Sequence, residues 1–322
     1  MPMSAERILR PLRPSVVLIR QWPVRGVSGS GCRSTRATMG AMEATIRTMQ
    51  RGDVDAAMEL AAREGWNPGL HDAACFFAAD AQGFLQAELD GQRVGCISAV
   101  AYGEDFGFIG LYIIEPAWRG QGMGWQLWQA GMARLAGRMV GLDGVPAQQD
   151  NYRRSGFELA WRNARFAGQA RHDRGPDAKG VVALSEVTFE ALCDADRRVF
   201  PAPRAAFLRA WITQPQACGL AVVEHGRLKG WGLIRPCREG HKIAPLVADE
   251  PAVAQVLFTA LQRRAPPRAG VFLDVPLPNA DAVALARRHG MAIVFETARM
   301  YRGAAPALAL ERVYGVTSFE LG

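Results

Sequence analysis

The sequence lacks an apolar run long enough to cross a membrane, although 49% of its 322 residues are hydrophobic. A spanning helix needs about 20 consecutive apolar residues. The apolar run Val16–Ile19 is far shorter than that, and it is also shorter than the ~7–15-residue core of a secretory signal. We therefore expect no membrane partner and a cytoplasmic location.

Closely spaced metal-binding or redox-active side chains are also absent. No two of the six cysteines are close enough for a zinc knuckle or a CxxC motif, and the five histidines form no spaced pair for a metal or a catalytic triad. The sequence therefore predicts no metal site, and reduced, buried thiols.

Lysine is scarce, with three among 38 basic residues, and the net charge of +7 is unevenly distributed. Residues 1–38 contain seven arginines and one acidic residue, Glu6, so they carry +6 of that charge and residues 39–322 are close to neutral. A nucleic-acid-binding protein needs its cations clustered on a folded face. The sequence shows no such cluster, so we expect no nucleic-acid partner.

The first part of the chain, residues 1–43, is predicted to be a disordered extension because it has no sustained periodicity. Its arginine-rich, acid-poor composition resembles an organelle transit peptide. The alternative is an upstream extension before a true start at Met39, Met42 or Met49. We favour this alternative, because the folded pattern begins near Ala44.

An internal repeat divides the rest of the chain into two units, predicted at residues 44–168 and 181–322 with a polar linker at 169–180. Five landmarks recur in one order with offsets of 131 to 135 residues. They are Gly91–Gly95 with Gly226–Gly230, Glu115-Pro116 with Glu250-Pro251, Leu142-Asp143 with Leu273-Asp274, Gly156 with Gly290, and Ala164-Arg165 with Ala298-Arg299. We therefore expect two copies of one domain.

Each unit shows the same predicted order, an opening helical stretch followed by short strands and two further helices. In the first unit the turn Asp90-Gly91 predicts a hairpin, and the apolar run Phe108–Ile114 predicts a buried strand. The predicted elements that follow are a helix at 122–136, a strand at 139–142, a short helix at 151–155 and a strand at 158–166. This order predicts an α+β fold in which each unit has a mixed, mostly antiparallel sheet flanked by helices.

The segment Arg119-Gly120-Gln121-Gly122-Met123-Gly124 connects the buried strand to the following helix. Glycines let the backbone approach a ligand closely, and a helix N-terminus attracts negative charge. The segment therefore predicts a pyrophosphate site. Its glycine spacing differs from that of a dinucleotide-binding fingerprint, and it lacks the Lys-Ser/Thr of a Walker A loop.

This segment, with the preceding Ile114-Glu115-Pro116-Ala117-Trp118, resembles the Arg/Gln-x-x-Gly-x-Gly/Ala loop of the GNAT N-acetyltransferases. Tyr152-Arg-Arg-Ser-Gly156-Phe157, 28 residues after Gly124, is similar to that family's Tyr-x-x-x-Gly-Phe. A bacterial tandem-GNAT subgroup is further suggested by Trp66–Gly69 with Asp72, by Gly141–Pro146 and by Gly315–Gly322.

The resemblance implies acetyl-CoA as cosubstrate and direct attack of an amine on the thioester. It implies cofactor contacts from the backbone near Ile113 and Ile114, from Arg119, Gly120, Gln121, Gly122, Met123 and Gly124, and from Asn151 and Tyr152. Tyr152 is the expected general acid, because a tyrosine hydroxyl has a pKa of about 10 and can give a proton to the departing thiolate. The alternative for Tyr152 is a packing role, and the alternative for Asn151 is a helix-cap role.

The general base and the acceptor site are less defined. Glu115 is a candidate base, although the second copy retains it as Glu250, which favours a structural role. Trp66, Asp72 and Asp143 are the expected substrate-binding residues; Asp143 meets the same objection through Asp274. A chain of water molecules is an alternative base.

The second copy departs from the motif, with no arginine or glycine after Glu250-Pro251 and with Ala286 at the position of Tyr152. We expect it to bind no acetyl-CoA and to buttress the first domain or wall its pocket. The expected activity is acetyl transfer to a primary amine of a small molecule or a peptide, by a monomer or homodimer. The alternative is a non-catalytic tandem module that senses acyl-CoA or binds a partner.

Overall fold

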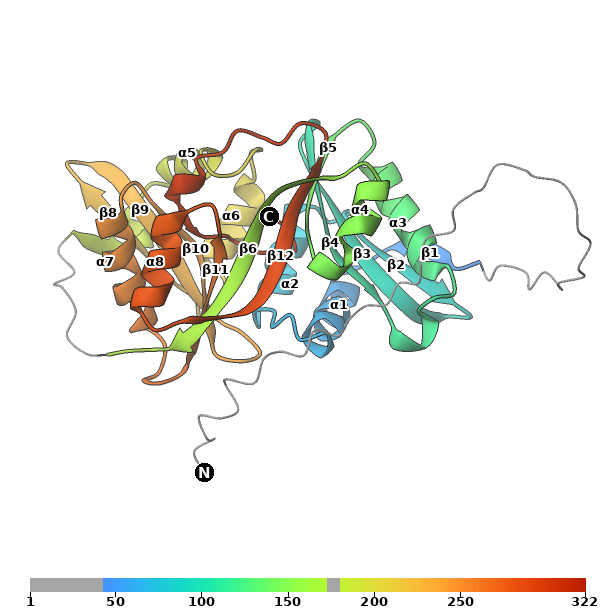
Figure 1. Cartoon of the computed structure of the whole chain (residues 1–322), viewed down its shortest axis with the longest axis horizontal. Coiled ribbons are helices and arrows are strands. Elements are labelled where there is room, and N and C mark those ends of the chain that lie inside the picture. Colours follow the sequence, from blue (N-terminus) through green and yellow to red (C-terminus); the bar gives the residue numbers. More distant parts are fainter. Residues whose placement is uncertain (1–42, 173–179) are drawn as a thin grey trace, which may run out of the picture.

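The structure, a computed structural model, describes residues 43–172 and 180–322 (Figure 1). The extension predicted at 1–43 therefore lies almost wholly outside the described residues, as does most of the predicted linker. The predicted boundaries of these two segments remain predictions.

The elements of the first half follow the predicted order, with an additional strand before the opening helix and an additional helix after it. They are β1 (Thr45–Thr48), α1 (Arg51–Arg63), α2 (Asp72–Ala79), β2 (Phe84–Leu89), β3 (Gln92–Tyr102), β4 (Phe106–Ile114), α3 (Met123–Arg134), β5 (Met139–Gly144), α4 (Gln149–Arg154) and β6 (Glu158–Gln169).

The second half repeats this order and adds one strand. Its elements are β7 (Val181–Ala183), α5 (Phe189–Arg197), α6 (Ala205–Ile212), β8 (Cys218–Glu224), β9 (Arg227–Pro236), β10 (His241–Ala248), α7 (Pro251–Gln262), β11 (Gly270–Pro276), α8 (Ala280–Arg288), β12 (Ala292–Arg302) and β13 (Val313–Gly315). The α+β class with a mixed, mostly antiparallel sheet in each half is confirmed.

The two halves exchange their last long strand. The sheet runs β1-β2-β3-β4-β5-β12-β6-β11-β10-β9-β8-β7, so β12 of the second half pairs with β5 of the first, and β6 of the first half pairs with β11 of the second. Figure 1 shows β6 and β12 side by side across the middle of the molecule. The repeat therefore divides the sequence into two consecutive units. In the sheet, the boundary between the two sides lies at the β12–β6 pair, so each side contains the last long strand of the other unit.

Two buried ion pairs link the exchanged strands, and all four of their residues are landmarks of the internal repeat. Arg299 on β12 donates to Asp143 on β5 at 3.0 and 2.6 Å, and Arg165 on β6 donates to Asp274 on β11 at 2.6 and 2.8 Å. All four side chains are at most 6% exposed. Each half thus supplies the aspartate for the other half's arginine, which explains why these landmarks recur as a set.

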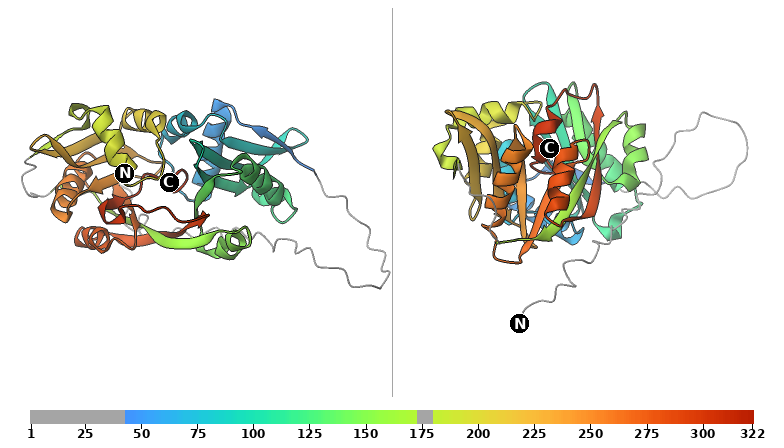
Figure 2. Two further views of the ribbon diagram at one scale, coloured as in Figure 1. Left: turned by 90° about the horizontal axis from the view of Figure 1, so that it is seen from above. Right: turned by 60° about the vertical axis from the view of Figure 1, so that its left-hand side comes forward.

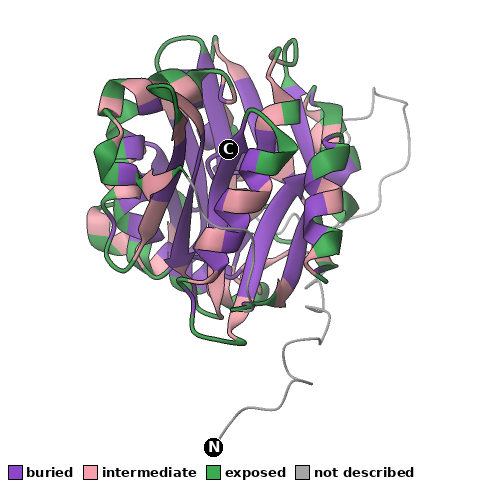
Figure 3. Ribbon diagram, turned by 90° about the vertical axis from the view of Figure 1, so that its left-hand side faces the viewer, coloured by how far each residue is buried: buried purple, intermediate pink, exposed green. Residues whose placement is uncertain are grey.

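The halves also share a hydrophobic core. It runs from α1 and α2 of the first half to α6, β9 and β10 of the second, and it includes the stacked rings of Phe76 and Trp211 at 6.2 Å. Figure 2 shows the chain's C-terminal end at the junction between the halves. In Figure 3 the central strands are buried and the outer faces of the helices are exposed. The junction is therefore part of the protein interior.

Among the residues described, no helix is long and apolar enough to cross a membrane.

Candidate active site

A pocket lies where β4 and β5 separate. These strands pair in parallel from Phe106 opposite Met139 to Ile109 opposite Leu142. A bulge in β4 then interrupts the regular strand, because two residues of β4, Leu111 and Tyr112, face one residue of β3, Ile97, and Leu111 adopts a φ of 45°. Beyond this point the edge of β4 that faces β5 has no strand partner over Tyr112–Ile114 within the described residues. Apart from the Ile114 carbonyl, which accepts a hydrogen bond from Arg119, this edge leaves backbone groups for a ligand.

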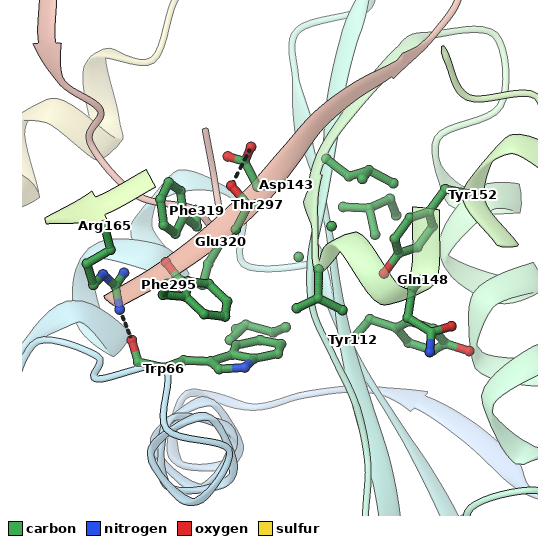
Figure 4. A pocket seen from close by; sticks show the side chains of 16 residues that line it. Trp66, Tyr112, Asp143, Gln148, Tyr152, Arg165, Phe295, Thr297, Phe319 and Glu320 are labelled. Atoms are coloured by element: carbon green, nitrogen blue, oxygen red, sulfur yellow. Dashed lines mark hydrogen bonds between the residues drawn. The ribbon is translucent and has the colours of Figure 1, made fainter. Parts of the chain in front are cut away.

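This junction pocket has an empty volume of about 710 Å³ including its open mouth, and both halves of the chain line it (Figure 4). Its lining residues are Trp66, Ile109, Gly110, Leu111, Tyr112, Leu142, Asp143, Gly144, Val145, Gln148, Tyr152, Arg165, Phe295, Thr297, Phe319 and Glu320. Of the residues predicted for substrate or catalysis, Trp66, Asp143 and Tyr152 are among them.

The glycine loop, Arg119–Gly124, connects β4 to α3 beside the separation of the strands. Gly120 and Gly122 have φ values of 78° and 86°, and an added Cβ at either position would meet no atom within 4 Å. Glycine is therefore required by the backbone conformation and leaves the surface open. The first turn of α3 contains no acidic residue, so the positive end of the helix dipole is not neutralised there.

Arg119 holds the loop in place. Its Nε donates to the carbonyl of Ile114 at 2.8 Å, and its guanidinium bonds Glu64 at the end of α1 at 2.5 Å. Gln121 donates to the carbonyl of Ala117 at 2.8 Å. These side chains organise the loop and leave its backbone to face a ligand. Glu64 was not predicted, because one glutamate on a surface helix carries no recognisable signal.

The last two positions of the loop differ in role. Met123 is fully buried in the core beneath α3. Gly124 provides clearance, because a Cβ there would lie 2.6 Å from the hydroxyl oxygen of Tyr112. The resemblance implied a cofactor contact from both residues, and their backbone amides at the start of α3 are the groups that remain for it.

Tyr152 is positioned by its neighbours on both sides. A Cβ on Gly144 would lie 2.2 Å from its ring, and Trp128 packs against the ring with centroids 5.6 Å apart. Helix α4 ends just after it, where Gly156 has a φ of 83° and the amide of Phe157 donates to the Tyr152 carbonyl at 3.1 Å. The Tyr-x-x-x-Gly-Phe motif thus ends the helix and fixes the tyrosine.

Two tyrosines share the pocket. Burial raises the pKa of Tyr152 above its usual value, so the hydroxyl stays protonated at neutral pH. Burial also raises the pKa of Tyr112, with an added effect from Tyr152. The buried Tyr112 hydroxyl has no hydrogen-bond partner among the described residues. Tyr112 was missed because a tyrosine within an apolar strand looks like an ordinary core residue.

The remaining predicted cofactor contacts lie near the pocket. Ile113 and Ile114 bury their side chains, and their backbone pairs with β3 at Cys96 and Gly95. Asn151 donates to the side chain of Gln148, which itself lines the pocket. Asn151 therefore orients Gln148.

Two predicted site residues lie outside the pocket. Glu115 accepts a hydrogen bond from the exposed Arg63 at 3.2 Å. Asp72 is buried, accepts from the amide of Gly69 at 2.8 Å and forms two hydrogen bonds with Arg235 on β9 of the second half, at 2.7 and 2.9 Å. These placements favour structural roles for both, since neither carboxylate lines the junction pocket.

The other predicted acceptor residues do line it. The carbonyl of Trp66 accepts from Arg165 at 2.7 Å. Asp143 is bound by Arg299 and also accepts from Asn163 at 2.7 Å. The opposite wall comes from Phe295 and Thr297 on β12 and from the tail after β13. The sequence predicted that the second copy could wall the pocket, but it did not indicate Phe295 or Thr297, because the strand exchange brings them from about 150 residues away.

The corresponding place in the second half is filled. Strand β10 leads almost directly into α7, whose first residue is Pro251, so no loop separates strand and helix. The separation of β10 from β11 is occupied by β13, which pairs with β10 through Leu246–Gly315 and Val247–Val313. The protein's own chain therefore bonds the strand edge that β4 leaves free.

These features define an acyltransferase of the GNAT class, and comparison with known proteins places the chain in that family. The chain belongs to the GNAT acetyltransferases and contains two GNAT domains in tandem. Residues 53–157 match the "Acetyltransferase (GNAT) family" and residues 192–315 match an "Acetyltransferase (GNAT) domain". The resemblance drawn from the two motifs is confirmed, and the family's acyl donor is an acyl-CoA.

Individual relatives extend over most of the chain. It is 29% identical over 265 residues to holothin acyltransferase of Pseudoalteromonas sp. (strain SANK 73390), covering 82% of this chain and 90% of that protein. A candidate acetyltransferase from Pyrococcus horikoshii shares the fold with a TM-score of 0.75 at 20% identity, over 90% of this chain and all of that one. A tandem GNAT protein from the clavulanic acid biosynthesis pathway gives a TM-score of 0.59 at 14% identity, over 82% of this chain and all of that one.

Proposed function

We propose that this acyltransferase moves the acetyl group of acetyl-CoA to a primary amine of a small molecule. The observation that carries the proposal is the position of Tyr152, which faces the gap between β4 and β5, while the glycine loop follows the end of β4 that borders the same gap. A donor whose pyrophosphate occupied the loop would extend its pantetheine arm along the free edge of β4 toward this tyrosine.

The proposed cofactor contacts are mostly backbone groups. The amides of the glycine loop and of the first turn of α3 bind the pyrophosphate, and the backbone near Ile113 and Ile114 pairs with the pantetheine amides. Arg119, held by Glu64, keeps the loop open. Asn151 acts through Gln148.

The proposed reaction is a direct attack. The neutral amine attacks the thioester carbonyl, the carbon–sulfur bond breaks, and Tyr152 gives its proton to the leaving thiolate. The raised pKa of Tyr152 suits a proton donor, because the group is fully protonated until it is needed. No covalent enzyme intermediate is required.

A small acceptor fits better than a peptide. The acceptor side of the pocket is enclosed by Trp66 from the first half and by β12 and the tail from the second, and the second half acts as this wall rather than as a second catalytic domain. The related holothin acyltransferase is consistent with a non-peptide acceptor.

The test is thiol release from acetyl-CoA across a panel of small primary amines and amine-bearing peptides, with propionyl-CoA and longer acyl-CoAs as alternative donors. We expect turnover with acetyl-CoA and at least one small amine. Turnover only with peptides would contradict the proposed small-molecule acceptor. Turnover only with longer acyl-CoAs would contradict the proposed acetyl donor. Acyl-CoA binding without turnover on any amine would favour the non-catalytic alternative.

A further inference from the structure

The inner end of the junction pocket is built by the tail that follows β13. This tail, residues 316–322, is buried throughout. The amide of Val316 donates to the Asp274 carbonyl at 2.8 Å, and Arg204 donates to Thr317 and to the carbonyl of Gly322, both at 2.9 Å. Tyr102 of the first half donates to the carbonyl of Leu321 at 3.0 Å. The tail is therefore fixed to both halves.

The tail meets β4 at its bulge. An added Cβ on Gly110 would lie 2.0 Å from the carbonyl oxygen of Glu320, so the two backbones touch and only glycine fits at residue 110. Ser318 accepts hydrogen bonds from the amides of Glu320 and Leu321, both at 3.0 Å. This local turn directs the Glu320 side chain into the pocket, where Figure 4 shows it among Trp66, Phe295 and Phe319.

The Glu320 carboxylate differs from its acidic neighbours. Asp72, Asp143 and Asp274 are each held by two hydrogen bonds from one arginine. Within residues 43–172 and 180–322, no side-chain hydrogen bond or ion pair engages the carboxylate of Glu320, which is 7% exposed and lines the pocket. It is the acidic group of the pocket that remains available to a ligand.

We propose that Glu320 binds the acceptor amine and takes its proton. This proposal rests on the proposed acetyl transfer. As the amine nitrogen forms its bond to the thioester carbon, one N–H proton passes to the Glu320 carboxylate, the carbon–sulfur bond breaks, and the thiolate receives the Tyr152 proton. The protonated carboxyl and the tyrosinate then exchange with solvent, so amine and acetyl-CoA give amide and CoA. The rings of Trp66, Phe295 and Phe319 select a compact, largely apolar amine.

The competing explanation is charge balance. The buried Arg165 and Arg235 interact electrostatically with Glu320, and Lys242 is buried beside Asp274. The buried carboxylates paired with these three cations are Asp72 and Asp274. If Glu320 only balanced the third positive charge, its removal would lower the free energy of unfolding and would have no specific effect on the amine.

The experiment compares Glu320→Gln with Glu311→Gln, a matched change at an exposed residue of the same C-terminal segment. For Glu320→Gln we expect a loss of ~100-fold or more in kcat/KM for the amine, a KM for acetyl-CoA within about twofold of the parent, and the same melting temperature. Glu311→Gln should behave as the parent. An unchanged kcat/KM for the amine in Glu320→Gln would overturn the proposal.

Chemical rescue covers the case in which the Gln variant is unstable. Formate should raise the rate of Glu320→Ala at least tenfold, because a small carboxylate can accept the proton in the vacated space. A folded Ala variant that formate does not rescue would overturn the proposal. The rise in melting temperature on adding an amine separates failure of this proposal from failure of acetyl transfer itself. If Glu320 binds the amine, the parent should show this rise and Glu320→Gln should lose it. If the parent binds amines but acetylates none of them, the proposed function alone is contradicted.

Discussion

Tyr152 shows how single residues set the chemistry of this site. Its ring occupies space that exists because residue 144 is glycine, and its helix ends at a second glycine, Gly156. Burial then raises its pKa. The proposed proton donor is thus held in one position and fully protonated, because residue 144 is glycine and Gly156 adopts the left-handed φ that ends the helix.

Replacing Tyr152 with Phe should remove the proton donor and keep the packing on Trp128. We expect kcat to fall by ~100-fold or more, with an unchanged dissociation constant for CoA, measured by steady-state kinetics and calorimetry. Tyr314→Phe is the control, because Tyr314 is a buried tyrosine that lies on β13 outside the pocket. Undiminished turnover in Tyr152→Phe would exclude this residue as the acid.

The pH dependence of the parent enzyme should reflect the same burial. Because the pKa of Tyr152 is raised above the usual tyrosine value of about 10, the donor form persists throughout neutral and mildly alkaline pH. We expect kcat to show no alkaline decline below about pH 10, in a pH–rate profile taken with a saturating amine. A decline centred near pH 8 that disappears in Tyr152→Phe would contradict this assignment.

Gly144→Ala tests directly whether the Tyr152 ring needs the space that glycine leaves at residue 144. The added methyl would lie 2.2 Å from the Tyr152 ring, so the ring must move away from the reacting atoms. We expect kcat to fall at least tenfold with little change in CoA affinity. Gly52→Ala is the control, because an added Cβ there meets no atom within 4 Å and Gly52, like Gly144, has no left-handed φ. Equal activities of the two variants would mean that the position of the ring is not critical.

At the scale of elements, the exchange of β6 and β12 creates the acceptor wall. It places Phe295 and Thr297 of the second half beside β5 of the first. The reciprocal pairs Asp143–Arg299 and Arg165–Asp274 hold the exchanged strands. A pocket that needs residues from both halves therefore depends on these two buried contacts.

Asp274→Asn should expose that dependence. It leaves Arg165 buried without its carboxylate, which costs roughly 3–5 kcal/mol of the free energy of unfolding, measured by urea titration at pH 7. Asp194→Asn, at an exposed aspartate, should change it little. Loss of less than about 1 kcal/mol in Asp274→Asn would show that the pair is not needed for the exchange.

The same variant should alter acid stability. Burial alone would raise the pKa of Asp274, but the charges of Arg165 and Lys242 outweigh it and hold the pKa below 3.8. The stabilisation is therefore complete above about pH 4 and is lost as pH falls below that value. Asp274→Asn should show a weaker loss of stability between pH 4 and pH 2 than the parent.

Sequence patterns predicted the parts of this molecule that are local. The glycine loop and the Tyr152 motif are short, and the order of elements follows hydrophobic periodicity. The exchange of strands was not predictable. Both copies carry an equivalent last strand, and its hydrophobic pattern is satisfied equally well in the sheet of its own half and in that of the other half. For the same reason Phe295 carried no signal. The segment Gly315–Gly322, which contains Glu320, resembles the tandem-GNAT subgroup, but nothing in its sequence indicated a place in the pocket. Asp72 was expected in the site and is bound to Arg235 instead.

At the scale of the whole molecule, only one of the two equivalent gaps between parallel strands is open within the described residues. The first half keeps the edge of β4 free beyond its bulge, while in the second half β13 pairs with that edge of β10. The loop before α7 is also missing. The second half has thus kept its sheet and used its gap to anchor the tail that completes the pocket of the first.

This asymmetry predicts one acyl-CoA per chain. Isothermal titration with CoA should give a stoichiometry of one, and Gly122→Ala should weaken binding about tenfold, because alanine at a φ of 86° is strained by about 1–2 kcal/mol at the loop that faces the pyrophosphate. Gly290→Ala is the matched control, since Gly290 has a φ of 70°, equally open surroundings and a place in the second half. It should bear the same strain and bind CoA normally. Two sites per chain, or equal weakening in both variants, would mean that the second half still takes part in binding the cofactor.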